Sequence, residues 1–225
     1  MAILKSRKKI NKNNIALEHL LLFKNHLGSR FSFRNNLIDE YIFGVDSTSN
    51  TIFNIEKTLV LLKRALNFLS SIKKGNKQIL FVGTSLKVRK LTKFVGKSIN
   101  EPYVNMRWVK GLLTNWESLS SSIKFYDLFL KRLDLTSKSE QKLKQTFQGL
   151  RSLKELPSVI FIIDLENDFE VVSEAKKLNI PIVAIIDNNS KFINQIDYPI
   201  LSNTGSILPF YLIISLVIET LKTIK

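Results

Sequence analysis

The sequence predicts an α/β protein in which a parallel sheet is covered by helices on both faces and interrupted by a helical hairpin. Three observations support this fold class. Short apolar runs alternate with helical patterns from Tyr41 onward. The runs 159–164 (VIFIID) and 182–187 (IVAIID) are apolar almost throughout, as expected of strands buried on both faces. From Thr114 to about Pro157 only helical spacing is found, which indicates an insertion.

The first strand and helix of the alternation are predicted between residues 51 and 74. Residues 51–55 favour a strand. The leucines of residues 56–74 recur at spacings of 3, 4 and 3, which places on one helix face Leu59, Leu62, Leu66 and Leu69. Gly75 and Asn76 then end this helix.

The later elements are predicted in the same way. Residues 78–82 (QILFV) favour a strand that ends at Gly83, and 103–106 favour a short strand. Helices are expected at 86–97, which is basic, and at 169–178. The apolar run from Ile207 to Ile218 is too short to span a membrane and favours a buried helix.

The predicted hairpin has a heptad seam followed by a turn and a second helix. Its first helix carries apolar residues at spacings of 3 and 4, namely Trp116, Leu119, Ile123, Tyr126, Leu130 and Leu133. The second carries Leu143, Phe147, Leu150 and Leu153. We therefore expect a basic tail and first helix over residues 1–35, an α/β domain over 36–112 and 157–225, and an inserted hairpin over 113–156.

The charge balance indicates a polyanionic partner. The chain of 225 residues has 34 Lys and Arg against 19 Asp and Glu, a net charge of +15. Nucleic acid is the commonest such partner, and an anionic membrane surface is the next. The absence of cysteine excludes disulfides, thiolate metal sites and a cysteine nucleophile. His19 and His26, seven residues apart, do not make a metal site by themselves, so we expect no metal and no cofactor.

Catalysis has little support in the sequence. Asp164 and Asp187 end two predicted strands, where ligands bind in parallel α/β proteins. An enzyme or a small-molecule-binding protein that uses these two residues is the alternative function. The segment 81–90 (FVGTSLKVRK) lacks the second half of a phosphate-binding P-loop. The simpler interpretation is that the acids hold loops and that the segment is a tight connection with a cationic helix start.

Cationic residues near aromatic ones are the candidate RNA contacts. Residues 103–116 contain Arg107, Lys110 and both tryptophans, although Trp116 is expected to pack at the base of the hairpin. We predict no catalytic residue. The predicted RNA-binding residues are Arg7, Lys8, Lys9, Lys12, Arg30, Arg34, Lys87, Arg89, Lys90, Arg107, Trp108, Lys110 and Asn115.

Five segments in order resemble the bacterial-type small-subunit ribosomal protein S-two family. They are ILFVGT, RWVKGLLTNW, LPSVIFIID, EAKKLNIPIVAIIDNN and IDYPILSN. His26 and Gly28 also match the family's His-x-Gly, and residues 41–44 match its Tyr-Ile-x-Gly strand. The resemblance covers about residues 26–206. It implies a Rossmann-like (flavodoxin-like) sheet with a protruding helical hairpin.

The resemblance also implies a non-catalytic structural role in the small ribosomal subunit. The expected partners are small-subunit rRNA and neighbouring ribosomal proteins, with no membrane contact and no homo-oligomer. In bacteria the family also helps to dock the large mRNA-binding protein. A peripheral membrane protein, which would use the basic residues and the apolar C-terminal run, is a third hypothesis.

The sequence departs from the family pattern at several positions. Ser85 and Lys110 stand where the family has Lys and Gly, and FSFRNNLID replaces its Trp-Asn-Pro-x-Met segment. Lys, Asn, Ile and Phe, whose codons are rich in A and T, are frequent. We therefore expect a divergent organellar version, on a mitochondrial ribosome and encoded in the organelle, with a plastid or a bacterial cytoplasm as alternatives.

Overall fold

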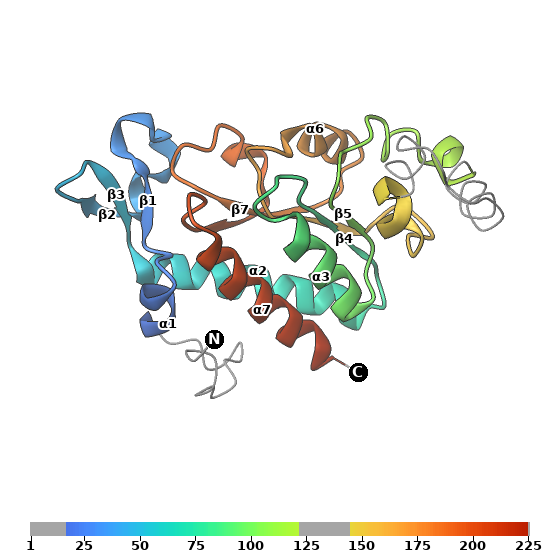
Figure 1. The fold of residues 1–225 in the computed structure, drawn as a ribbon, viewed down its shortest axis with the longest axis horizontal. Helices are drawn as coiled ribbons and strands as arrows, with labels where there is room; N and C mark the ends of the chain where they lie inside the picture. Colours follow the sequence, from blue (N-terminus) through green and yellow to red (C-terminus); the bar gives the residue numbers. More distant parts are fainter. Residues whose placement is uncertain (1–16, 122–144, 225) are drawn as a thin grey trace.

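The computed structural model describes residues 17–121 and 145–224, which form two sheets (Figure 1). Within these residues, the larger sheet is parallel and has five strands in the order β5-β4-β6-β7-β8. The chain starts this sheet at β4, crosses to β5 at one edge and then adds the remaining strands on the other side. This is the order of flavodoxin-like folds, so the predicted α/β class is confirmed. The strands are β4 (Ile79–Val82), β5 (Tyr103–Val104), β6 (Val159–Ile162), β7 (Ile182–Ile186) and β8 (Tyr198–Leu201).

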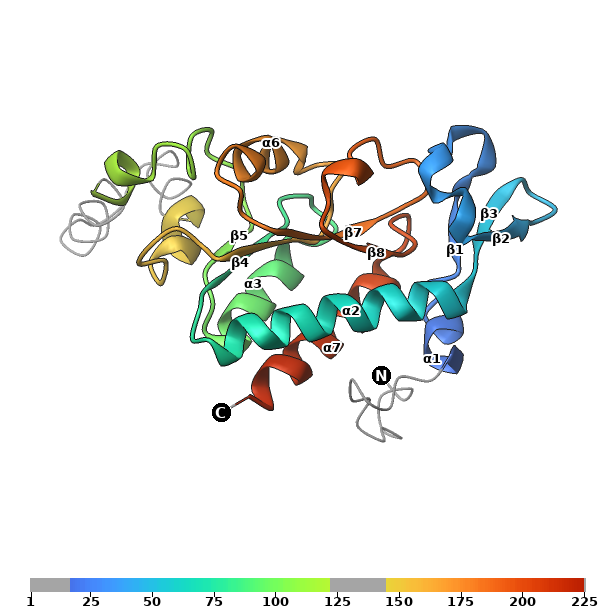
Figure 2. The same cartoon turned by 180° about the vertical axis from the view of Figure 1, so that it is seen from behind.

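Helices cover both faces of this sheet, as Figures 1 and 2 show. One face carries three long helices, α2 (Ile55–Lys74), α3 (Arg89–Ile99) and α7 (Ile207–Lys222). The other face carries α6 (Phe169–Lys177) and the loop that follows β5. The single-turn helices η5 (Gln148–Leu150) and η6 (Ile193–Gln195) lie in the connections before β6 and β8.

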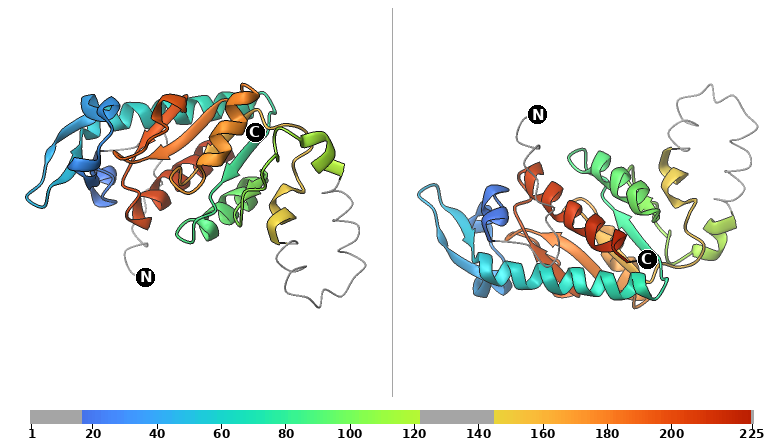
Figure 3. Two further views of the ribbon diagram at one scale, coloured as in Figure 1. Left: turned by 90° about the horizontal axis from the view of Figure 1, so that it is seen from above. Right: turned by 90° about the horizontal axis from the view of Figure 1, so that it is seen from below.

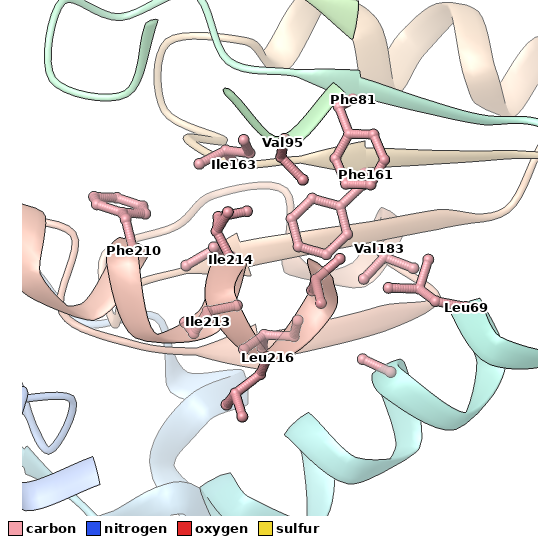
Figure 4. Packing of buried hydrophobic residues seen from close by; sticks show 14 of the residues in the cluster. Leu69, Phe81, Val95, Phe161, Ile163, Val183, Phe210, Ile213, Ile214 and Leu216 are labelled. Atoms are coloured by element: carbon pink, nitrogen blue, oxygen red, sulfur yellow. The ribbon is translucent and has the colours of Figure 1, made fainter. Parts of the chain in front are cut away.

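The central strands are apolar throughout because each face meets its own hydrophobic core. In β4, Ile79 and Phe81 join the core beneath α2, α3 and α7, whereas Leu80 and Val82 join the core beneath α6. β6 and β7 alternate in the same way. Figure 4 shows the first core, in which the rings of Phe81 and Phe161 lie 5.3 Å apart. Such two-sided burial explains why no polar alternation is seen in these strands.

The long helices begin and end close to where the sequence predicts. Asn54 caps α2 by accepting a hydrogen bond from the backbone N–H of Lys57, and Gly75 follows its last residue. The helix buries the predicted apolar face, including Leu62 and Leu66. α7 is a core helix, with most of its apolar side chains buried. Its burial confirms the prediction of a buried helix for this run.

Several elements differ from their predicted bounds, α3 and β5 among them. α3 begins at Arg89 rather than at residue 86, because residues 86–88 form a turn that closes the connection from β4. β5 has two residues rather than four. His19 and His26 do not share a helix, since α1 (Leu17–Leu22) ends between them.

The N-terminal part contains a small antiparallel sheet that the sequence did not predict in full. Its order is β1-β3-β2. It lies at one end of the molecule (Figure 3). β1 pairs with β3, so the predicted boundary at residue 35 divides this sheet. The four residues of β1, LGSR, have no apolar alternation that could have revealed them. The elements are β1 (Leu27–Arg30), β2 (Ile42–Val45), β3 (Asn50–Phe53), η3 (Phe31–Phe33) and η4 (Asn36–Tyr41).

Only the two ends of the predicted hairpin belong to the described residues. Residues 116–121 and 145–147 are helical. Trp116, Leu119 and Phe147 are partly buried against the core beneath α6, and Leu150 and Leu153 are buried in it. The remaining seam residues and the turn lie outside the described part of the chain, so the inserted hairpin stays a prediction.

Candidate nucleic-acid interface

The carboxyl ends of the strands gather acidic and hydroxyl side chains, which hydrogen-bond to one another. Asp187, at the end of β7, is fully buried. Its carboxylate accepts hydrogen bonds from Ser29 Oγ at 2.7 Å and from Thr204 Oγ1 at 3.1 Å. The neighbouring Asn188 donates to Thr51 Oγ1 at 2.9 Å. Asp187 and Asn188 therefore join the small sheet and the loop after β8 to the large sheet.

A second buried carboxylate holds the turn after β4. Asp168 accepts hydrogen bonds from the backbone N–H of Thr84 at 2.9 Å and from its hydroxyl at 2.6 Å. Burial raises the pKa of Asp168 from 3.8 to about 6, although the bonds from Thr84 oppose that rise. Asp164 accepts from Asn167 at 2.9 Å. These bonds support the interpretation that the acids hold loops.

The strand ends do not form a metal centre among the residues that the structure describes. No group of three or more acidic or histidine side chains in that part of the chain is arranged to hold an ion. Burial, the largest cause, and the charges of Asp187 and Asp164 raise the pKa of Glu166, while Asn189 and Lys87 lower it. Nothing in this geometry favours the alternative of an enzyme that uses Asp164 and Asp187.

The loop between β5 and the hairpin is fixed from beneath by a glutamate of α6. Glu174, 8% exposed, accepts hydrogen bonds from Trp108 Nε1 at 2.9 Å, Gly111 N at 2.8 Å and Leu113 N at 3.0 Å. Trp108 is itself only 6% exposed. We therefore remove Trp108 from the candidate RNA contacts, because a buried ring whose N–H is already bonded cannot stack on a base.

The same loop exposes the other polar residues predicted from this segment. Arg107, Lys110 and Asn115 are all exposed. Lys110 pairs with Glu170 at 3.0 Å, but its side chain is 76% exposed. Since an exposed pair of this kind contributes little to stability, Lys110 can exchange Glu170 for a phosphate at small cost.

The turn before α3 and the first residues of α3 present a second cationic group. Lys87 and Lys90 are exposed, and Lys87 Nζ donates to the carbonyl of Thr204 over 3.3 Å. Arg89 is partly buried and donates to the carbonyl of Thr84 over 3.1 Å. Arg89 therefore helps to shape the turn, whereas Lys87 and Lys90 face solvent.

A third group lies at the small sheet. Arg30, at the end of β1, is exposed. The guanidinium of Arg34 lies 3.9 Å from the ring centroid of Phe31 and pairs with Asp39 at 2.7 Å. The four cationic residues predicted in the tail lie outside the described residues: Arg7, Lys8, Lys9 and Lys12.

The three groups lie on separate elements, namely the loop after β5, the turn and start of α3, and the small sheet (Figure 1). Within residues 17–121 and 145–224, no helix has the length and apolarity needed to cross a membrane. The roles of Asp168 and Glu174 leave no pattern in the sequence, because their hydrogen-bond donors are distant along the chain. From the basic helix the predicted RNA contacts include only Lys87, Arg89 and Lys90, although Lys93 and Lys97 follow Lys90 at helical spacing.

Comparison with known proteins decides the family. Residues 20–223 match the family model of ribosomal protein S2. The chain belongs to the ribosomal protein S2 family. The small ribosomal subunit protein uS2 of Tolumonas auensis is 33% identical over 224 residues, which cover 94% of this chain and 92% of that protein. The uS2 of Wigglesworthia glossinidia brevipalpis is 32% identical over 225 residues, with 94% and 93% covered.

Membership of the S2 family decides the class of protein. Proteins of this family are structural constituents of the small ribosomal subunit and not enzymes. The chain is accordingly a ribosomal protein of the translation apparatus. A third relative, the uS2 of Anaplasma phagocytophilum, is 35% identical over 195 residues, 81% of this chain and 66% of that protein. These relatives are bacterial, so the comparisons support a ribosomal location without assigning it to an organelle.

Proposed function

We propose that this chain binds small-subunit rRNA through phosphate contacts spread over the loop at Arg107 and Lys110, the turn at Lys87 and Lys90, and the small sheet at Arg30. It acts as a structural constituent that holds RNA and neighbouring ribosomal proteins in place. No catalytic step is part of this role. The predicted basic tail and inserted hairpin would extend these contacts to further surfaces.

One observation carries the proposal, namely the different burial of acidic and basic side chains. Five carboxylates are less than 9% exposed: Glu101, Asp164, Asp168, Glu174 and Asp187. No Lys or Arg of the described residues is buried to that degree. The surface is therefore more cationic than the net charge of +15 suggests, and a phosphate backbone complements it.

Contacts to phosphates would supply affinity, and the rigid fold would supply specificity. An A-form RNA helix hides its base edges in a deep major groove, so proteins recognise it largely by shape. Asp187, Asn188, Asp168 and Glu174 all fix loops that carry cations, which keeps the charged groups at constant separations. A fixed pattern of charges can match one folded RNA surface better than another.

Sedimentation of a native lysate through a sucrose gradient tests this function. We expect the chain to migrate with small-subunit rRNA in stoichiometric amounts, to resist moderate salt and to shift when magnesium is removed. A chain that stays at the top of the gradient as a free protein would contradict the proposal.

We further propose a mitochondrial ribosome as the location. The support is the composition, rich in Lys, Asn, Ile and Phe, together with the departures from the family pattern at Ser85 and Lys110. Fractionation of the source cells before the gradient tests it. A ribosomal peak in the mitochondrial fraction is the expected result, whereas a peak in plastids or in a bacterial cytoplasm would overturn it.

A further inference from the structure

The solvent face of α3 combines cations with an exposed aromatic ring. Residues 86–97 contain five Lys and Arg and no acidic residue. The helix packs on the large sheet through Leu91 and Val95, which are buried. On the opposite side Lys90, Phe94 and Lys97 follow one another at spacings of four and three residues, and all three are exposed. Residues at these spacings are neighbours on a helix surface.

Phe94 lies in the middle of α3 with more than half of its surface exposed. Its side chain is 59% exposed although the residues beside it in α3 pack well. Phe94 belongs to neither hydrophobic core. A single exposed apolar residue needs no explanation by itself. Its place between two lysines, however, gives a flat apolar surface bordered by positive charge.

The flanking lysines have no acidic partner within the described part of the chain. Neither Lys90 nor Lys97 forms an ion pair there. Lys93 donates only a long hydrogen bond, 3.4 Å, to Gln148 Oε1. Neighbouring ammonium groups repel one another, so this face favours a ligand that carries several negative charges.

We propose that this face of α3 binds an unpaired stretch of RNA, with one base stacked on Phe94 and the adjacent phosphates bound by Lys90 and Lys97. Alternating aromatic and cationic side chains are how proteins hold single-stranded nucleic acid, because bases stack on rings while phosphates meet cations. Paired RNA does not satisfy the site, since its bases are stacked inside the duplex. The inference rests on the proposed function and adds a class of ligand and a residue, Phe94, that does not act by charge.

Fluorescence anisotropy with the full chain tests the proposal, using labelled oligo(A) of twelve nucleotides and a twelve-base-pair RNA duplex as probes. Phe94→Leu keeps the residue apolar but removes the ring. We expect it to weaken binding of oligo(A) by roughly 5- to 150-fold, the range for one base–aromatic stack, with an unchanged salt slope and unchanged duplex binding. Phe94→Trp should retain the wild-type affinity.

Lys90→Ala and Lys97→Ala should each reduce the salt slope for oligo(A) by about 0.7, the value for one phosphate of a single strand. Phe43→Leu is the matched control, because Phe43 is 77% exposed on β2, away from this face. Unchanged thermal unfolding of each variant shows that the fold is intact.

Equal affinities of Phe94→Leu and the wild type for oligo(A) would overturn the proposal. A wild-type protein that does not bind oligo(A) would also overturn it. If small ribosomal subunits that contain the Phe94→Leu variant lose a neighbouring protein while their RNA contacts are unchanged, the proposal is also overturned. This face of α3 would then be a protein contact. None of these results changes the expected migration of the chain with small-subunit rRNA in the sucrose gradient. The anisotropy experiment can therefore reject the role of Phe94 without rejecting the ribosomal role.

Discussion

The carboxylate of Glu174 accepts a hydrogen bond from the indole N–H of Trp108 over 2.9 Å, and both side chains are buried. The same carboxylate accepts the backbone N–H groups of Gly111 and Leu113. One side chain of α6 thus determines the path of the loop that carries Arg107 and Lys110.

Replacing Glu174 by Ala should therefore destabilise the protein. Three donors would lose their acceptor, and two of these bonds are buried, so we expect a loss of about 2–4 kcal/mol in the free energy of unfolding. Urea denaturation measures it. Glu170→Ala, a partly exposed position on the same helix, is the control and should cost less than about 0.5 kcal/mol. Equal stability of the two variants would contradict the role of Glu174.

The two tryptophans should differ in their contribution to stability. Trp108 is buried and hydrogen-bonded, so Trp108→Ala should cost about 3–5 kcal/mol. Trp116 is only partly buried, and we expect about 1–3 kcal/mol for Trp116→Ala, less than a fully buried ring would require. Thermal unfolding of both variants measures the two losses of stability. A larger loss for Trp116→Ala than for Trp108→Ala would contradict this prediction.

The stability of the fold should depend on pH through Asp168. Because burial raises its pKa from 3.8 to about 6, the folded protein holds this proton more tightly than the unfolded chain does. The protonated carboxyl therefore stabilises the fold below about pH 4, and this contribution is lost as the pH rises through about 6. Asp168→Asn should remove up to about 3 kcal/mol of that dependence. Unfolding free energies at several pH values between 4 and 7, compared with those of the exposed Asp39→Asn, measure it.

Loss of Asn188 should loosen the small sheet without unfolding the large one. Asn188 Nδ2 donates to Thr51 Oγ1 at 2.9 Å and to the carbonyl of Ser29 at 3.1 Å, and its Oδ1 accepts from Ser29 N at 2.7 Å. We expect Asn188→Ala to cost about 2–3 kcal/mol and to increase hydrogen exchange most in residues 27–53. Asn203→Ala serves as a partly exposed comparison. A uniform increase over both sheets would show that Asn188 does not act locally.

RNA binding should respond to Arg107 and Lys110 through the salt dependence. Each Ala variant should weaken association with rRNA and reduce the slope of log K against log salt by roughly one phosphate. Glu170→Gln should have the opposite effect on affinity, because it frees Lys110 from its 3.0 Å pair. Titrations at several salt concentrations measure these slopes, and an unchanged slope would show that the residue does not touch RNA.

Local sequence patterns predicted four of the five strands of the large sheet and its long helices. They did not predict β8, and the strand predicted at 51–55 is β3 of the small antiparallel sheet. The leucine spacing of α2 and the apolar runs of β6 and β7 arise from burial of a whole face or of both faces, which leaves a periodic trace in the sequence. The prediction that Asp164 and Asp187 hold loops also agrees with the hydrogen bonds found at both residues. The start of α3 was less accurate, because the turn before it depends on Asp168, 84 residues away from Thr84.

By itself, then, the sequence determined the α/β class, the order of the main elements, the family and the excess of positive charge. These depend on which residue types follow one another. The tertiary structure decided that Trp108 is buried, that β1 joins a small sheet and that Phe94 lies exposed between lysines. Each of these depends on partners distant along the chain, such as Ser29 and Asp187, which are 158 residues apart. A hydrogen bond between such groups leaves no periodic pattern, so only the folded chain reveals it.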